Sequence, residues 1–329
     1  MFPDQITQTL TNLFKQTNRG LVLFLQGPPG MGKTAIVGQA AQNADKKLVT
    51  FALPTCESVD LRGLPFVERG TTRWASPLPC EGQGILLLDE LSSAAPDVQV
   101  AAHHIVHAEP GSDMSLAPSW HLVLTGNRAV DKTLFRAASG PLRNRLTIIN
   151  AEPDVKQWCE WAMSNDIDPV ISGFIRWRPE LLMSKDIPGE GAFPSPRSWE
   201  AVSRILKLQT SVVVEEELIR GTVGDGATTE FAAYLRTARE LPEIEAILKE
   251  QSKSQVPKSP SQLYALVTSL AQYTREHAKS AMKYVSRMPA EFALLYVQDI
   301  RNHYDIRADK DVGKWISEHR TLFDTGLSA

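Results

Sequence analysis

The sequence has little of what marks a secreted or membrane protein. Its 329 residues include three cysteines, and Cys56, Cys80 and Cys159 form no closely spaced metal-ligand pair. Such sparse cysteines are typical of free thiols in a reducing compartment. The N-terminus MFPDQITQ lacks a cationic segment followed by an apolar one, and no apolar run approaches the roughly 18 residues of a membrane span. These absences favour a cytoplasmic protein without a membrane partner.

The sequence also lacks a strong charge of either sign. Its formal net charge is −3, so no overall field attracts nucleic acid, although a local basic groove is not excluded. The hydrophobic content of 43% and charged content of 22% are those of an ordinary globular protein. The length suits a core of about 150 to 250 residues together with a second module.

The strongest pattern that is present is GPPGMGKT, between the apolar run 21–26 and a helix-like run. Its spacing is that of the Walker A phosphate-binding loop, in which glycines let backbone N–H groups surround phosphate oxygens at a helix N-terminus. A lysine in the first helical turn faces the positive end of the helix dipole, which an adjacent anion would offset. We therefore expect bound ATP, with the threonine hydroxyl holding Mg²⁺. The expected nucleotide contacts from this loop are Gly27, Pro28, Pro29, Gly30, Met31, Gly32, Lys33 and Thr34.

Five short apolar runs bounded by turn residues predict buried strands. Because helical or irregular stretches separate the first three, we expect a parallel α/β sheet with the nucleotide at the carboxyl ends of its strands. A short amphipathic helix is expected over 3–18, before the first strand. The predicted strands are 21–26, 47–53, 84–90, 121–127 and 146–150.

The remaining segments divide the chain further. Residues 60–79 alternate apolar positions around Gly70 and predict an inserted hairpin, and 107–120 predicts a second one. From Ala151 onward the pattern is helical, and the polar, proline-containing stretch 249–261 is typical of a linker. Leu263, Leu266, Val267 and Leu270 then share a helical face, as approximately do Val312, Trp315, Ile316 and Phe323. We expect domains at 1–150, 151–248 and 249–329.

Polar residues at the ends of two predicted strands could carry chemistry. Asp89 and Glu90 end the third strand, and two adjacent carboxylates there are costly unless a cation or a reacting water uses them. We expect Asp89 to hold the Mg²⁺ shell and Glu90 to polarise the water that attacks the γ-phosphate. Asn127 ends the fourth strand, where its amide can orient the same water or simply cap a turn.

Three arginines are further candidates. Arg143 and Arg145 precede the fifth strand, where they could also be a solvated helix end. Arg197 follows Ser195 and Pro196, a helix start, so its charge also lies at an unfavourable dipole end that a γ-phosphate would offset.

The ordered set GPPGMGKT, ILLLDE, LTGN, PLRNRL and SPR resembles the AAA+ ATPases, and the two insertions resemble the MoxR branch. The resemblance covers roughly residues 5–240. It implies an AAA+ P-loop core with a five-stranded parallel sheet, an α-helical lid and a C-terminal helical extension. It also implies that Asn127 is sensor 1, Arg145 the arginine finger and Arg197 sensor 2.

In biological terms, the resemblance implies a ring-forming ATP hydrolase, expected as a hexamer. Such a protein acts as a chaperone-like remodeller or maturation factor on a protein target, often with a von Willebrand factor A domain partner. Leu146 follows Arg145 where family members often carry Phe. The finger therefore stays open between Arg143 and the favoured Arg145, and Arg143 is kept among the nucleotide-binding candidates.

Two other functions stay open, a nucleic-acid motor such as a helicase loader and an ATP-dependent assembly switch with little turnover. The absence of a basic tail counts against the first. His103 and His107 have a spacing that can bind zinc, but without a further ligand we interpret them as packing or subunit-contact residues. Trp74 is interpreted as supporting its own hairpin rather than gripping a substrate.

Overall fold

A computed structural model describes residues 1–17, 20–79, 81–108, 115–131, 136–187, 190–249, 253–301 and 310–320. The chain divides into two compact units, which are described separately. Unit 1 is Met1–Asp154 with Lys185–Glu190, and unit 2 is Val155–Ser184 with Gly191–Ala329. Among the described residues, no helix is long and apolar enough to cross a membrane.

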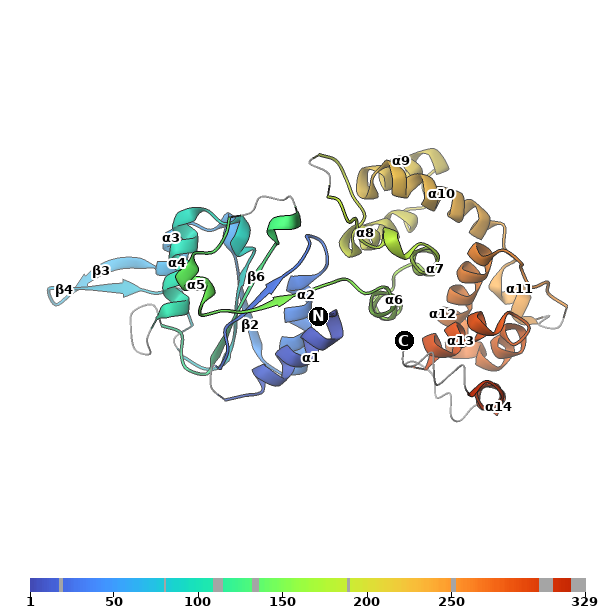
Figure 1. Ribbon diagram of the computed structural model, residues 1–329, viewed down its shortest axis with the longest axis horizontal. Helices are drawn as coiled ribbons and strands as arrows, with labels where there is room; N and C mark the ends of the chain where they lie inside the picture. The colour runs from blue at the N-terminus through green and yellow to red at the C-terminus, as the bar shows by residue number, and fades with distance from the viewer. Residues whose placement is uncertain are drawn as a thin grey trace. The chain divides into compact units, whose positions relative to one another are not determined.

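Unit 1 is built on a parallel sheet that has, in the described residues, five strands in the order β2-β5-β6-β1-β7 (Figure 1). The predicted strands and the predicted parallel sheet are thus confirmed, with ends that differ by a few residues. Gln26 of β1 pairs with Gly126 of β6 and Asn150 of β7, so these three strands end at one edge of the sheet. The strands are β1 (Leu23–Gln26), β2 (Lys47–Ala52), β5 (Gly84–Asp89), β6 (Trp120–Gly126) and β7 (Thr147–Asn150).

Helices cover both faces of this sheet, because successive strand residues point to opposite sides. Leu23 and Leu25 pack in one buried cluster with α1 (Pro3–Phe14) and α2 (Lys33–Asn43). Phe24 packs in a second cluster, with residues of α3 (Ser58–Arg62) and α4 (Pro96–His107). The continuous apolar character of the strands follows from this burial on both faces. Shorter elements of unit 1 are η1 (Leu53–Thr55), η2 (Leu91–Ser93), η3 (Ala129–Asp131) and α5 (Gly140–Arg143).

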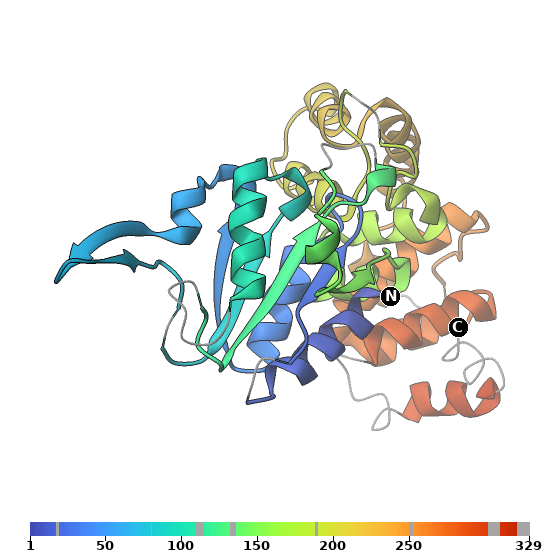
Figure 2. The ribbon, with the colours of Figure 1, turned by 60° about the vertical axis from the view of Figure 1, so that its left-hand side comes forward.

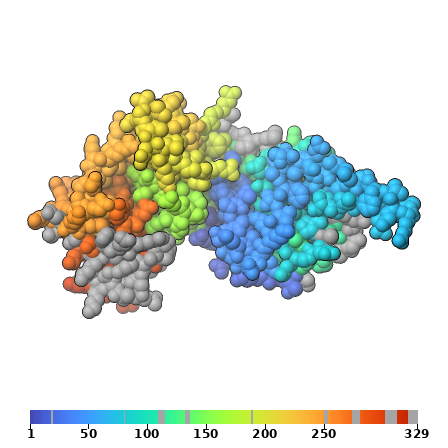
Figure 3. Space-filling view, turned by 180° about the vertical axis from the view of Figure 1, so that it is seen from behind, coloured from blue at the N-terminus to red at the C-terminus, as the bar shows by residue number. Residues whose placement is uncertain are grey.

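Within 60–79, β3 (Leu64–Glu68) and β4 (Thr71–Ala75) form an antiparallel hairpin. Arg69 and Gly70 connect them and both have positive φ, as tight hairpin turns require. Every strand residue of the hairpin is exposed, and it stands out from the rest of unit 1 (Figures 2 and 3). Of the second expected hairpin, residues 109–114 lie outside the described residues, and 115–119 contain no strand.

Unit 2 is helical throughout its described residues. One apolar cluster is formed mainly by residues of α6 to α10, and another by residues of α11 to α14. The predicted helical face at Leu263, Leu266, Val267 and Leu270 is buried in the second cluster, whereas Phe323 lies outside the described residues. The helices are α6 (Val155–Ser164), α7 (Pro169–Trp177), α8 (Pro196–Leu206), α9 (Val212–Val223), α10 (Asp225–Arg239), α11 (Ile244–Lys249), α12 (Pro260–Val285), α13 (Ala290–Ile300) and α14 (Lys310–Glu318), with the short η4 (Pro179–Leu181).

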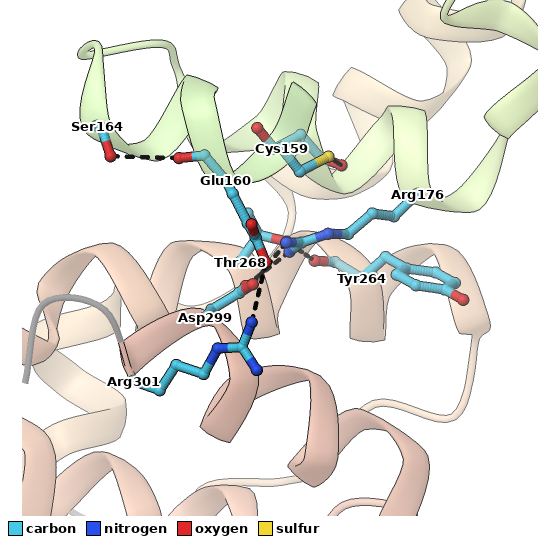
Figure 4. Close-up of polar contacts among 9 residues, drawn as sticks. Cys159, Glu160, Ser164, Arg176, Tyr264, Thr268, Asp299 and Arg301 are labelled. Atoms are coloured by element: carbon cyan, nitrogen blue, oxygen red, sulfur yellow. Dashed lines mark hydrogen bonds and ion pairs between the residues drawn. The ribbon is translucent and has the colours of Figure 1, made fainter. Parts of the chain in front are cut away.

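A buried ion pair joins the early and late helices of unit 2 (Figure 4). Arg176 of α7 donates from both terminal nitrogens to the two carboxylate oxygens of Asp299 on α13, each at 2.6 Å. Its Nη1 also lies 3.4 Å from Thr268 Oγ1 on α12. Burial alone would lower the pKa of Arg176, but the Asp299 carboxylate raises it above the ordinary value. The pair therefore clamps α7 and α13 together within this unit.

Candidate functional site

The loop between β1 and α2 has a backbone that requires glycine. Gly30 and Gly32 have φ of 79° and 94°, in the left-handed region that other residues rarely adopt. A Cβ at Gly27 would lie 2.7 Å from Met31 Sδ and 3.0 Å from the Ala151 carbonyl oxygen. Gly32 is the N-cap of α2 and brings no side chain to its first turn. The loop therefore presents a helix N-terminus, where backbone N–H groups and the dipole favour an anion.

Lys33 begins α2 and is only 8% exposed. Its Nζ donates to the carbonyl oxygens of Gly27 and Pro28 at 2.8 and 3.0 Å, and to Asn127 Oδ1 at 3.0 Å. The last bond links the loop to the end of β6, which is 94 residues away in sequence. Lys33 and Asn127 therefore belong to one site, and the ammonium group is held above the loop.

The two carboxylates at the end of β5 have different surroundings. Asp89 Oδ2 accepts a hydrogen bond from Thr34 Oγ1 at 2.9 Å, while Oδ1 accepts a short one from Thr125 Oγ1. Glu90 is exposed, but its backbone N–H donates to Thr125 Oγ1 at 3.0 Å. Glu90 also has φ of 60° and ψ of 42°, a left-handed conformation that is uncommon outside glycine. The turn after β5 thus gives these neighbouring residues different hydrogen-bond partners and different exposure.

A second hydroxyl ties the turn after β5 to β6. Ser92 Oγ accepts the backbone N–H of Asn127 at 2.8 Å, and the Ser92 carbonyl accepts the N–H of Arg136 at 2.8 Å. Arg136 Nη1 also donates to the Ala94 carbonyl at 2.9 Å. Ser92 is 2% exposed, and its bond to the Asn127 N–H is buried. The position of Asn127 is therefore fixed through its backbone as well as its side chain.

Sequence reasoning assigned no role to Thr125 or Ser92, although both contact predicted site residues. A signal was present, because Thr125 is a polar residue near the end of the mainly apolar run HLVLTGN, two residues before Asn127. Ser92 lies two residues after Glu90, in a turn whose backbone conformation could not be predicted from the sequence. A polar residue at the end of an apolar run marks a candidate, but its partners are known only once β6 is seen to pair with β5.

The candidate arginines do not join the network described above. Arg143 ends α5 and Arg145 follows it shortly, and both are exposed residues of unit 1. Arg197 is an exposed residue in the first turn of α8 in unit 2. Ser195 caps that helix by accepting the Ser198 N–H at 3.1 Å, so the helix start expected from sequence is present. Exposure leaves each of the three free to contact groups outside its own unit.

The histidines of α4 form a pair rather than a complete metal site. The rings of His103 and His107 meet edge to face, with centroids 4.0 Å apart, and both Nε2 atoms are buried with no hydrogen-bond partner. Burial and the neighbouring positive groups, including Arg145, lower the pKa of both imidazoles. No group of three or more potential metal ligands occurs in the part of the chain that the structure describes.

The residues around Lys33 fit a magnesium-bound nucleoside triphosphate. The glycine-dependent loop and Lys33 suit phosphate oxygens. The Thr34 hydroxyl and Asp89 Oδ2 are the hard oxygen ligands that Mg²⁺ prefers, and they lie 2.9 Å apart. Exposed Glu90 lies next in the chain and carries a free carboxylate to the same edge of the sheet. The arrangement can therefore bind phosphates, hold a divalent cation and orient water.

Comparison with known proteins relates part of unit 1 to one family model. Residues 22–137 match the family model described as AAA domain (dynein-related subfamily). No curated protein matches the chain. Among solved structures, NtrX from Brucella abortus is similar at 16% identity over 91% of this chain and 67% of that one, with a TM-score of 0.41.

A second similar structure is the Thermotoga maritima RuvB Holliday junction branch migration motor. It has 18% identity over 83% of each chain and a TM-score of 0.40. The range 22–137 that the family model matches contains the loop after β1, Asp89 at the end of β5, and Asn127 directly after β6. Unit 1 has the AAA+ P-loop fold, and residues 22–137 are the part of it that matches the family model.

Proposed function

We propose that this chain is a Mg²⁺-dependent ATP hydrolase of the MoxR type, which assembles into a hexameric ring and remodels or matures a protein target. The observation that carries the proposal is the hydrogen-bonded network at the carboxyl ends of the strands. Within it, Thr34 contacts Asp89, and Lys33 contacts Asn127. These contacts bring together four predicted site residues from three separate parts of the sequence.

Each residue then has a definite task. The loop amides and Lys33 would bind the β- and γ-phosphates, and Thr34 and Asp89 would hold a Mg²⁺ ion, which supplies positive charge against the charge that develops on the phosphates. Glu90 would accept the proton of the attacking water, because it is an exposed carboxylate residue that directly follows Asp89. The Asn127 amide donates to that water or to the γ-phosphate once Lys33 has turned toward the phosphates. Catalysis is therefore mainly positioning and electrostatic stabilisation.

The ring follows from the proposed role of Arg145. An arginine that a neighbouring subunit supplies to a nucleotide site typically contributes about 10³ to 10⁵ in rate, so an isolated subunit should be a poor ATPase. Arg145 is exposed on unit 1, as an outward contact requires. In the same scheme Arg197 contacts the γ-phosphate as sensor 2. Its motion would couple hydrolysis to displacement of the lid.

The proposal is tested by phosphate release at increasing protein concentration. We expect wild-type turnover per subunit to rise with concentration and Glu90→Gln to lose it. If the wild-type protein hydrolyses ATP no faster than Glu90→Gln at any concentration, the motor hypothesis is wrong. The ATP-dependent assembly switch is then the function that fits. If double-stranded or single-stranded DNA stimulates turnover and an unfolded protein does not, the target is nucleic acid and not protein.

The proposed finger has its own test. Arg145→Ala subunits have an intact loop, and Lys33→Ala subunits have an intact finger, so mixing the two inactive variants should restore some sites across the interface. Arg143→Ala mixed with Lys33→Ala is the matched comparison. If ATPase activity recovers only in the mixture that contains Arg143→Ala, the arginine finger is Arg143. If it recovers in neither mixture, the nucleotide site is not shared between subunits.

The protein target and partner are the least constrained part of the proposal. The expected partner is a protein with a von Willebrand factor A domain. Affinity capture with Glu90→Gln loaded with ATP should retain the target and the partner, because slow hydrolysis prolongs the ATP state. A partner retained equally by Lys33→Ala would not depend on the nucleotide, which contradicts an ATP-driven remodeller.

A further inference from the structure

We propose that Thr125 is a positioning residue for the cation and the water activator, acting through Asp89 and Glu90. This inference rests on the proposed nucleotide site. Thr125 lies one residue before the end of β6, is fully buried, and is two residues before Asn127. Its effect is exerted on the two carboxylate residues of the neighbouring strand end.

The Thr125 hydroxyl uses both of its hydrogen-bonding capacities in this contact. It donates to Asp89 Oδ1 and accepts the Glu90 backbone N–H at 3.0 Å. A hydroxyl group has one proton to donate. Because the Thr125 hydroxyl donates it to Asp89 Oδ1, its oxygen acts only as acceptor toward the Glu90 N–H. Valine has nearly the same shape but can make neither bond. A single atom, Thr125 Oγ1, therefore bonds both the Asp89 carboxylate and the Glu90 backbone.

The contact decides which oxygen of Asp89 is offered to a cation. With Oδ1 engaged by Thr125, Oδ2 faces Thr34 Oγ1 at 2.9 Å, where both can act as ligands. Loss of the Thr125 hydroxyl would let the carboxylate rotate and would leave Oδ1 without this donor. We therefore expect the variant to lose cation-dependent nucleotide affinity while retaining the affinity that the loop provides alone.

The same hydroxyl supports the unusual backbone of Glu90. A non-glycine residue in the left-handed region persists only where its surroundings hold it there. The Glu90 N–H bond to Thr125 supplies such support, and the preceding residues pair in parallel with β6, with Leu88 opposite Leu124. Without the bond, Glu90 can relax toward a more ordinary conformation, which redirects its carboxylate. Turnover should then fall even at saturating nucleotide and Mg²⁺.

The experiment compares Thr125→Val with Thr125→Ser, which keeps the hydroxyl. Fluorescent ADP is titrated against the full chain with Mg²⁺ and again with EDTA, and steady-state kcat and KM are measured with ATP. Thr11→Val is the matched control, because Thr11 is also a buried threonine of unit 1 and its hydroxyl contacts only the Thr7 carbonyl of its own helix. Thr125→Ala takes the place of Thr125→Val if the latter does not fold.

For Thr125→Val we expect affinity in Mg²⁺ to fall about tenfold, as for loss of a bond to a charged group, with affinity in EDTA unchanged. Its kcat should also fall, whereas Thr125→Ser and Thr11→Val should behave as wild type. An equal loss of affinity with and without Mg²⁺, an unchanged Thr125→Val, or a Thr125→Ser as impaired as Thr125→Val would each overturn the inference. Wild-type protein that binds no nucleotide would instead refute the proposed function itself.

Discussion

Each unit of this protein holds a buried cation, and the two cations are held in different ways. In unit 1, Lys33 donates to two backbone carbonyls and an amide oxygen, all of them uncharged groups. In unit 2, Arg176 faces a carboxylate that matches its fork with two bonds of 2.6 Å. These Lys33 bonds tie the loop to the end of β6, whereas the Arg176 bonds pair the guanidinium with the buried carboxylate of Asp299. The two buried cations therefore differ in what they join, namely a loop and a strand end in unit 1 and two helices in unit 2.

The largest effect is expected from removing one partner of the unit 2 pair. Asp299→Ala leaves a buried guanidinium without its carboxylate, which typically costs about 3 to 5 kcal/mol of unfolding free energy. The double variant Arg176→Met with Asp299→Leu should recover most of that loss, because no charge stays buried. Urea unfolding followed by tryptophan fluorescence measures both. Equal destabilisation by the single and double variants would show that the pair is not a structural clamp.

The next effect concerns the ligand of unit 1. A nucleotide that binds only the folded state at 100 times its dissociation constant stabilises that state by about 2.7 kcal/mol. We expect Mg²⁺ and ADP to give such a shift in the urea unfolding of wild-type protein. Lys33→Ala should lose it, and the unit 2 double variant should keep it. A shift of the same size in Lys33→Ala would place the nucleotide elsewhere.

A smaller effect is expected at Ser92. Ser92→Ala removes the acceptor of the Asn127 N–H, and a hydrogen bond of this kind contributes about 1 kcal/mol net. The result should be a modest loss of stability and a lower kcat with little change in nucleotide affinity, because Asn127 is displaced while Lys33 stays. Steady-state kinetics beside urea unfolding would check this. A change in KM alone would contradict a role in placing Asn127.

The smallest expected effect is that of a thiol reagent on Cys159 in the wild-type protein. Burial raises the pKa of this thiol to about 11, so at pH 8 it is protonated as well as shielded. A thiol reagent should leave Cys159 unmodified in the native protein, while partly exposed Cys56 reacts. Peptide mass spectrometry distinguishes the two sites. Asp299→Ala should accelerate modification of Cys159, and unchanged protection would mean that the clamp does not keep this region closed.

Much of unit 1 could be predicted because its signals are local. Short apolar runs predicted the strands, and the glycine spacing predicted a loop whose φ angles indeed require glycine at Gly30 and Gly32. The tasks proposed for Lys33, Asp89 and Glu90 stay predictions, although the structure brings these residues to one edge of the sheet. The roles of Thr125 and Ser92 depend on which strand lies beside β5, and that neighbour is chosen by tertiary packing.

Unit 2 shows more clearly how far the structure could be predicted from the sequence. Arg176 and Asp299 are 123 residues apart, and each lies in an ordinary amphipathic helix. No periodicity distinguishes a buried charge from an exposed one until the helices are packed. Sequence reasoning could therefore predict that this region is helical, but not that an ion pair joins α7 to α13.

Calorimetric titration of the full chain with Mg²⁺ and a slowly hydrolysed ATP analogue tests the central claim most directly. Wild-type protein and the unit 2 double variant should each bind one nucleotide per chain, and Lys33→Ala should bind at least tenfold more weakly. Absence of binding to the wild type, or equal affinity for wild type and Lys33→Ala, would contradict a nucleotide site built on the loop of unit 1.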